Sequence, residues 1–418
     1  MEIKLLAVLL FYLAVEAAEQ FLLLLNLKHL ARHGAEVPPG FAEYVNAETL
    51  TKIRDYTVAH GRADTVESLS SMAITLLFLF GGLLNWFNNV IGAQNWSPVT
   101  AGVIFYLLLV YADTVLKIPF SLYNTFVLEK RFGFSNQTPI LWIQDMVKSL
   151  LINTLLLGVL FYGILWLVMS LPEIWWLAGW GFVLLFSIFV LYLSPYVIEP
   201  FFNKFSAIED TSLEERIKKI MARAGLQINR VFTMDASKRS GHSNAYFTGI
   251  GHVKRIVLFD TLLANHTPDE IIAILAHEAG HWKKKHVLKM LVLNQAVALA
   301  GFYAAYRLTR GDLLAELFKL DVPSIYAKLL LVAFIGTLVL FPLKPVMAYL
   351  ARCHEIEADD FALQLTGAPG PMANALMRLG KDNLANLHPH PWFAAVYYSH
   401  PPLATRVKRI LAERAGAA

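Results

Sequence analysis

Residues 271-IIAILAHEAGHWKKKH-286 combine the pattern H-E-x-x-H with a basic run, at a point where an apolar segment ends. On a helix, His277 and His281 are one turn apart and project to the same side, so their imidazoles can hold one zinc ion. Glu278 lies beside them and can reach a water at that ion without being a ligand. The segment therefore predicts a hydrolytic metal site.

The same segment carries the signals of a helix start. Thr267 at the N-cap, Pro268 at the first helical position and Glu270 three residues after the cap form a capping box. A five-residue pattern also recurs by chance, and the alternative is two surface histidines on an amphipathic helix. Ala279 and Gly280 weigh against that alternative, because small residues permit a close approach at the site.

The composition indicates a membrane protein. The chain has 418 residues, of which 56% are hydrophobic and only 16% are charged. Lys148 and Glu173 enclose one uncharged run, and Glu173 and Glu199 enclose another. Each run is long enough to cross a bilayer, which needs about 20 apolar residues. The net charge of +4 is small for this length, and no concentrated basic stripe predicts binding to nucleic acid.

Apolar segments predict seven transmembrane helices. They lie at about residues 3–26, 69–88, 99–124, 149–171, 175–198, 287–306 and 326–350. A charged, mixed region at 200–285 contains 254-KRIVLFD-260, whose alternation is typical of a strand. The predicted fold is an all-α polytopic membrane protein with a small β element. It divides into a transmembrane domain at 1–200 and a second domain at 201–418.

Seven spans place residues 200–285 and 351–418 on the same side of the membrane, where they can build one site. Lys and Arg concentrate in the loops on that side, so the positive-inside rule puts the N-terminus outside and the soluble parts in the cytosol. Arg307, Arg310 and Lys319 lie on the other side and oppose this orientation.

A catalytic metal site needs a third protein ligand. The single cysteine, Cys353, excludes a cysteine-rich zinc site, so the ligand must be a histidine or a carboxylate. The candidates lie in 351-ARCHEIEADDFA-362, where Glu355 and Asp359 are four residues apart on a helix. One can bind metal while the other orients a ligand or moves protons. Glu357 is the alternative ligand, and a solvated acidic helix face is the alternative to any site.

These motifs resemble those of the type I CaaX prenyl endopeptidases, a family of integral-membrane zinc metalloproteases. The family combines H-E-x-x-H before a membrane span with a later motif, S-R-x-x-E-x-x-A-D. Arg352, Glu355, Ala358 and Asp359 are in register with that motif, and Ala351 replaces its serine. The segments 113–134 and 383–407 also look like family hallmarks, so the resemblance covers the chain from about residue 50 onward.

The resemblance implies a gluzincin-like site with one zinc ion per chain. It assigns His277, His281 and Glu355 to the metal, Glu278 to the general base, and Asp359 to proton transfer or to orienting a ligand. These roles are expectations that follow from the family pattern.

Further positions are assigned to the substrate. Asn244 and Ala245, in 241-GHSNAYFTG-249, fit the family's edge strand, which holds the substrate backbone by strand addition. His400 is the implied donor to the developing oxyanion, and Arg406 is expected to support it through an ion pair. Without the resemblance, Asn244 and Ala245 would indicate an ordinary turn before a strand.

The predicted function is therefore zinc-dependent hydrolysis of peptide bonds, with removal of the last three residues after a prenylated cysteine as the implied reaction. The partners are a peptide or protein substrate and the lipid bilayer. A quality-control protease without a prenyl requirement is one alternative. A metal or proton transporter is another, and its important groups would be Glu16, Glu19, Asp113 and Lys117.

Overall fold

The computed structural model describes residues 3–248 and 253–416, and within them seven helices are long and apolar enough to cross a membrane. The first is α1 (Ile3–His33). The others, with the short turns that extend them, are α2–η1 (Ala47–Phe80), α4–η2–α5 (Pro98–Phe132), α6 (Pro139–Ser170), α7–η3–α8 (Trp175–Phe202), α12 (His286–Thr309) and α14–η5–α15 (Ile325–Thr366). The prediction of a seven-span helical membrane protein is confirmed. The division into domains at residue 200 stays a prediction.

The second span differs from the prediction at both ends. It was expected at residues 69–88, but α2 already begins at Ala47, where the Asn46 side chain accepts a hydrogen bond from Thr49 N. The span ends at Phe80 because the backbone turns at the next two glycines, with Gly82 at φ +86°. The remaining apolar residues form a separate helix, α3 (Leu83–Gly92).

A four-stranded sheet lies between the fifth and sixth spans in the sequence. Its strands are β1 (Phe205–Ala207), β2 (Gln227–Met234), β3 (Ala245–Thr248) and β4 (Val253–Phe259), in the order β1-β2-β4-β3. β2 and β4 run parallel, and the two outer strands pair antiparallel to them. The strand predicted at 254–260 is confirmed, and β3 is an edge strand of the described sheet.

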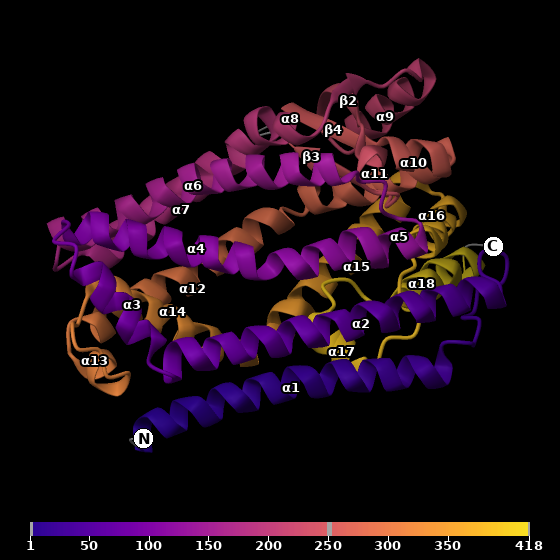
Figure 1. Ribbon diagram of the computed structural model, residues 1–418. Coiled ribbons are helices and arrows are strands. Elements are labelled where there is room, and N and C mark those ends of the chain that lie inside the picture. Colours follow the sequence, from indigo (N-terminus) through magenta and orange to yellow (C-terminus); the bar gives the residue numbers. More distant parts are fainter. Residues whose placement is uncertain (1–2, 249–252, 417–418) are drawn as a thin grey trace.

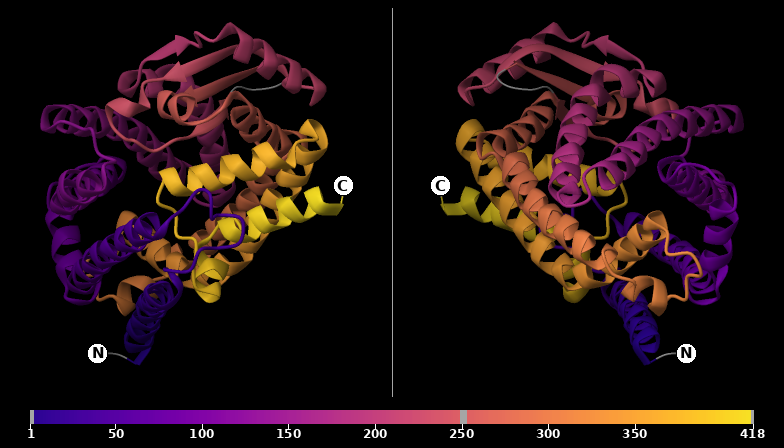
Figure 2. Two further views of the ribbon diagram at one scale, coloured as in Figure 1. Left: turned by 90° about the vertical axis from the view of Figure 1, so that its right-hand side faces the viewer. Right: turned by 90° about the vertical axis from the view of Figure 1, so that its left-hand side faces the viewer.

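The soluble elements gather toward one end of the long helices, and α3 and α13 (Leu313–Leu317) lie at the other (Figure 1). This group comprises α9 (Thr211–Arg223), α10 (Asp260–Asn265), α11 (Pro268–Lys283), α16 (Pro369–Asp382), α17 (Pro391–Tyr397) and α18 (Leu403–Gly416). Figure 2 shows α16 and α18 beside α15 when the molecule is viewed along its spans. The two regions that were expected on one side of the membrane are therefore in contact.

Helices α11 and α15 pack almost backbone to backbone. A Cβ atom added at Gly280 would lie 2.9 Å from Ala358 Cα and 3.0 Å from Ala358 O. The capping box at the start of α11 is also present, with Thr267 N donating to Glu270 Oε2 at 2.9 Å. The predicted close approach is confirmed, because a glycine at this crossing leaves the space that α15 occupies.

We expect Gly280→Ala to destabilise the protein, because the added methyl group has no room between the two helices. Overpacking of this kind costs about 1–3 kcal/mol. The matched control is Gly301→Ala in α12, where an added Cβ meets nothing within 4 Å. The measurement is the melting temperature of each purified variant in detergent. Equal melting temperatures for the two variants would contradict the close packing.

Candidate metal centre

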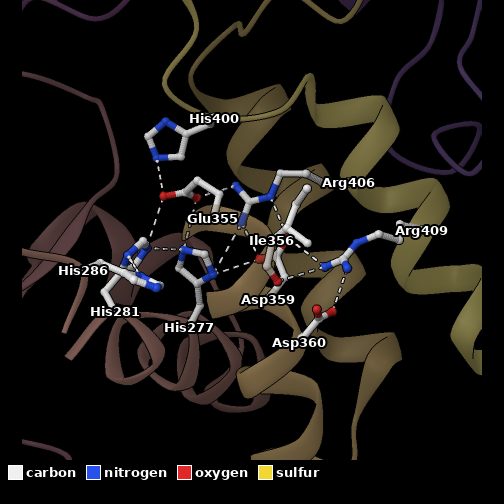
Figure 3. Close-up of polar contacts among 10 residues, drawn as sticks. All are labelled: His277, His281, His286, Glu355, Ile356, Asp359, Asp360, His400, Arg406 and Arg409. Atoms are coloured by element: carbon white, nitrogen blue, oxygen red, sulfur yellow. Dashed lines mark hydrogen bonds and ion pairs between the residues drawn. The ribbon is translucent and has the colours of Figure 1, made fainter. Parts of the chain in front are cut away.

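Three side chains from two helices converge on one point. His281 Nε2 lies 3.2 Å from His277 Nε2 and 3.1 Å from Glu355 Oε1. His277 Nε2 lies 3.3 Å from Glu355 Oε2, and one ligand atom from each residue falls within 4.8 Å of the others. The two histidines come from α11 and the glutamate from α15, as Figure 3 shows.

The arrangement fits a metal ion. Glu355 is only 6% exposed, and its Oε2 atom is buried without a hydrogen-bond partner. The two imidazole nitrogens also point toward each other across 3.2 Å, which is unfavourable unless a cation or a proton lies between them. Two imidazoles and one carboxylate are a common set of ligands for a catalytic metal with an open position.

Asp359 orients one of these histidines. Its Oδ1 atom lies 2.8 Å from His277 Nδ1, on the side of the ring away from Glu355, and the residue is fully buried. A hydrogen bond at Nδ1 fixes the tautomer and leaves Nε2 free for a metal. Of the two roles that the sequence left open for Asp359, this position favours the orienting role.

Arg406 pairs with Asp359, and not with His400 as was expected from the sequence. Its Nε and Nη2 atoms donate to the two oxygens of Asp359, at 3.0 and 2.6 Å. The physical reason is burial: a carboxylate in the interior needs a counter-charge, and bidentate pairing with arginine supplies it. Arg406 thus pairs with the carboxylate that contacts His277, and its Nη1 atom also lies 3.5 Å from Glu355 Oε2. It lines the pocket at the site as well.

Glu357, the alternative ligand, lies outside the converging group. Its Oε2 atom lies 3.1 Å from His286 Nε2 and 3.7 Å from Lys289 Nζ. His286 Nδ1 in turn lies 3.0 Å from His281 Nδ1. Glu357 therefore contacts a neighbour of His281 and faces a different side of α15 from Glu355, so it is not among the three residues that could hold one ion.

A pocket opens beside the converging group. It is lined by Asn244, Ala245, His277, Glu278, Leu262, Ala273, Ile274, Met372, Ala375, Leu376, Leu379, His400 and Arg406. Burial raises the pKa of Glu278 and lowers that of His400. A carboxylate with a raised pKa is better suited to accept a proton near neutral pH, and a histidine with a lowered pKa stays neutral there.

His400 lies at the mouth of this pocket. Its Nε2 atom is 3.3 Å from Glu355 Oε1, and its Nδ1 atom is 2.9 Å from Ser399 Oγ. Arg352 fixes the chain just before it: Nη1 donates to Ala394 O, Ala395 O and Tyr398 O at 3.0, 3.2 and 2.8 Å. No role for Arg352 was expected from the sequence, although its register in the motif was the available signal.

The start of the edge strand borders the same pocket. Ala245 is the first residue of β3, and the backbone carbonyl of Asn244 accepts a hydrogen bond from Phe259 N at 3.1 Å. β3 pairs with β4 on one side only within the described sheet. The structure thus brings both predicted substrate-binding residues to the pocket that contains Glu278.

The ion pairs of the transporter alternative lie elsewhere. Lys117 Nζ is 3.0 Å from Asp113 Oδ2 within one helix, and both side chains are exposed. Glu19 pairs with Lys344 of α15. These contacts pair three of the four groups, Asp113, Lys117 and Glu19, and neither they nor Glu16 belong to the converging group.

Comparisons with known proteins cover nearly the whole chain. Residues 26–204 match the family described as CAAX prenyl protease N-terminal, five membrane helices, and residues 207–414 match Peptidase family M48. CAAX prenyl protease 1 of Saccharomyces cerevisiae is 32% identical, over 89% of this chain and 88% of that protein. The CAAX prenyl protease 1 homolog of Homo sapiens is 29% identical, over 97% of this chain and 94% of that protein.

A solved structure has the same fold. The crystal structure of S. mikatae Ste24p superposes with a TM-score of 0.91 at 30% identity, covering 98% of this chain and 99% of that chain. An alignment of this extent includes the seven spans as well as His277, His281 and Glu355. The chain therefore belongs to Peptidase family M48 and is a multi-pass integral-membrane metalloendopeptidase similar to the CAAX prenyl proteases.

Proposed function

We propose that this enzyme uses one zinc ion to remove C-terminal residues from prenylated proteins at the membrane. The observation that carries the proposal is the convergence of His277, His281 and Glu355 beside an edge strand, at the end of a membrane span. The relatives named CAAX prenyl protease support the substrate class.

The types of ligand atom support zinc as the proposed metal. Nitrogen from two imidazoles and oxygen from one carboxylate suit zinc, which keeps an open fourth position in catalytic sites. When bound, zinc supplies Lewis acidity, which lowers the pKa of a water to about 7 and polarises a carbonyl. His277, His281 and Glu355 would hold it.

The protein's own groups complete the reaction. Glu278 takes a proton from the attacking water and passes it to the leaving amine, a role that its raised pKa favours. His400, neutral and accepting a hydrogen bond from Ser399 at Nδ1, presents Nε2–H to the oxygen of the scissile carbonyl. The edge of β3 that has no partner strand within the described sheet pairs with the substrate backbone, with Asn244 directly before the strand and Ala245 at its start.

The catalytic side is proposed to face the cytosol. Lys283, Lys284 and Lys285 directly precede the sixth span, where they would meet anionic headgroups of the cytosolic leaflet. The same orientation places hydrolysis at the membrane surface, where a prenylated C-terminus is anchored by its lipid.

Replacing Glu278 with Gln should abolish turnover while leaving the metal in place. The glutamine side chain has nearly the same shape as glutamate, but its amide cannot take a proton from the water. We expect a fall in kcat of about 100- to 10,000-fold, with one metal ion per chain retained. Peptide cleavage and metal analysis of the purified protein measure the two quantities. Glu214→Gln, which alters a partly exposed pair with Lys218 away from the converging group, is the matched control and should behave as wild type. Loss of metal in Glu278→Gln would contradict its role as a base.

Replacing Asp359 with Asn should weaken metal binding, because His277 loses the carboxylate that fixes its tautomer. Loss of such an orienting group typically reduces metal affinity about 10- to 100-fold. Competition with a chromophoric chelator measures this affinity. Asp360→Asn is the control, since Asp360 contacts Arg409 and not a metal-binding histidine. An equal affinity in the two variants would show that Asp359 has no such role.

The substrate class is tested with two peptides that differ only in the prenyl group. We expect cleavage of both to depend on zinc and on Glu278, with a higher kcat/KM for the prenylated peptide. The lipid chain raises the local concentration of substrate at the membrane, so the assay uses protein in liposomes. Equal kcat/KM values for the two peptides would favour the quality-control alternative.

A further inference from the structure

The chain that leads into the edge strand is held by the N-terminal membrane helices. We call residues 236–243 the β3 lead-in, and residues 133–138, between α5 and α6, the α5–α6 loop. Gly241 N donates to Phe134 O at 2.8 Å, and Asn136 N donates to Arg239 O at 3.1 Å. Ser135 and Ser240 form an antiparallel bridge between these contacts. The two segments thus pair along their backbones.

Side chains strengthen this pairing. Arg239 makes a bidentate ion pair with Asp145 of α6, with Nε–Oδ2 and Nη2–Oδ1 distances of 2.7 and 2.9 Å. The Asn136 side chain donates to Ser237 O at 2.9 Å. Both partners of the lead-in belong to the region before residue 200, so the membrane helices fix the path of the chain toward the substrate-binding strand.

Near the end of the lead-in, the two ring nitrogens of His242 contact side chains on opposite sides of the ring. Its Nδ1 atom lies 3.0 Å from Asn383 Oδ1, and its Nε2 atom lies 3.4 Å from Glu129 Oε2. The Asn383 amide also accepts from Ser243 N and donates to Ser243 O, which establishes which end is the oxygen. Nδ1 therefore donates to Asn383, and the second ring nitrogen faces a carboxylate.

Glu129, at the start of α5, joins three parts of the chain. Its Oε1 atom accepts from Tyr56 Oη at 2.8 Å and lies 2.9 Å from His60 Nε2, both on α2. Its other oxygen faces His242, whose ring stacks on Phe134 with centroids 4.0 Å apart. The hydrogen bond to Glu129 raises the pKa of His242, although burial opposes this. His242 therefore stays protonated, and paired with Glu129, up to a higher pH than it would without this carboxylate.

Only one residue separates His242 from Asn244. Thr261 Oγ1 donates to His242 O at 2.9 Å, and Phe259 N donates to Asn244 O at 3.1 Å, so the backbone is held at both points. Because Ser243 alone joins His242 to Asn244, we expect loss of the contacts that hold the His242 ring to displace the first residues of β3 relative to Glu278 and His400. Because strand addition depends on the position of backbone groups, such a shift weakens substrate binding.

We propose that Glu129 is a positioning residue of the peptidase: through His242 it sets the start of the edge strand that binds the substrate backbone. The inference rests on the proposed roles of Asn244 and Ala245. If so, the N-terminal membrane helices contribute to peptide binding through Glu129, in addition to any part they play in contacting lipid.

The test exploits the two nitrogens of His242. His242→Gln keeps a donor near the Nε2 position, facing Glu129, whereas His242→Asn keeps one near Nδ1, facing Asn383. We expect Glu129→Gln and His242→Asn each to raise KM for a prenylated peptide about three- to tenfold, with kcat within about twofold of wild type. His242→Gln should keep a KM near the wild-type value. The double variant Glu129→Gln/His242→Asn should resemble either single variant, because coupled residues give non-additive effects.

The matched control is Glu173→Gln, which removes a carboxylate paired with Tyr306 and Arg310, away from the β3 lead-in. Cleavage by the unaltered chain and by this control tests the proposed function separately. Given that cleavage, KM in Glu129→Gln equal to KM in Glu173→Gln would overturn the inference. So would a higher KM in His242→Gln than in His242→Asn, since the position of the strand would then depend on Asn383. If Glu129→Gln does not accumulate, the pair of His242 variants decides.

Discussion

The site depends on the close crossing of α11 and α15. Gly280 lies so near Ala358 that no side-chain atom fits between the backbones, and this brings His277 and His281 of one helix to Glu355 of the other. A wider crossing would separate the ligands beyond the reach of one ion. Both helices are continuous with membrane spans: α11 leads into the sixth span, and α15 extends the seventh. The spans therefore help to position this crossing.

Two layers of contacts keep the converging groups in place. Asp359 and Arg406 hold His277 from inside the protein, while Arg352 holds the backbone that carries His400. Each uses a buried or partly buried charge whose desolvation is offset by several hydrogen bonds. The β3 lead-in adds a third set of contacts, since it connects the substrate-binding edge to the helices that precede residue 200.

Much of this could be predicted from local patterns in the sequence. The capping box at Thr267 and the spacing of His277 and His281 depend on neighbours within one helix, so they can be read directly. The end of the second span could not, because apolar residues continue past Gly82, where a left-handed backbone turn ends the helix. The partner of Arg406 was missed because the need of buried Asp359 for a counter-charge appears only once burial is known.

The central claim is that one zinc ion is held by two imidazoles and a carboxylate contributed by two helices. X-ray absorption spectroscopy of the purified protein at the zinc edge tests it most directly. We expect one zinc per chain, bound through two histidine nitrogens and carboxylate oxygen, and a changed spectrum with loss of zinc in Glu355→Ala. A spectrum without histidine ligands, or one that is the same in Glu355→Ala, would contradict the account.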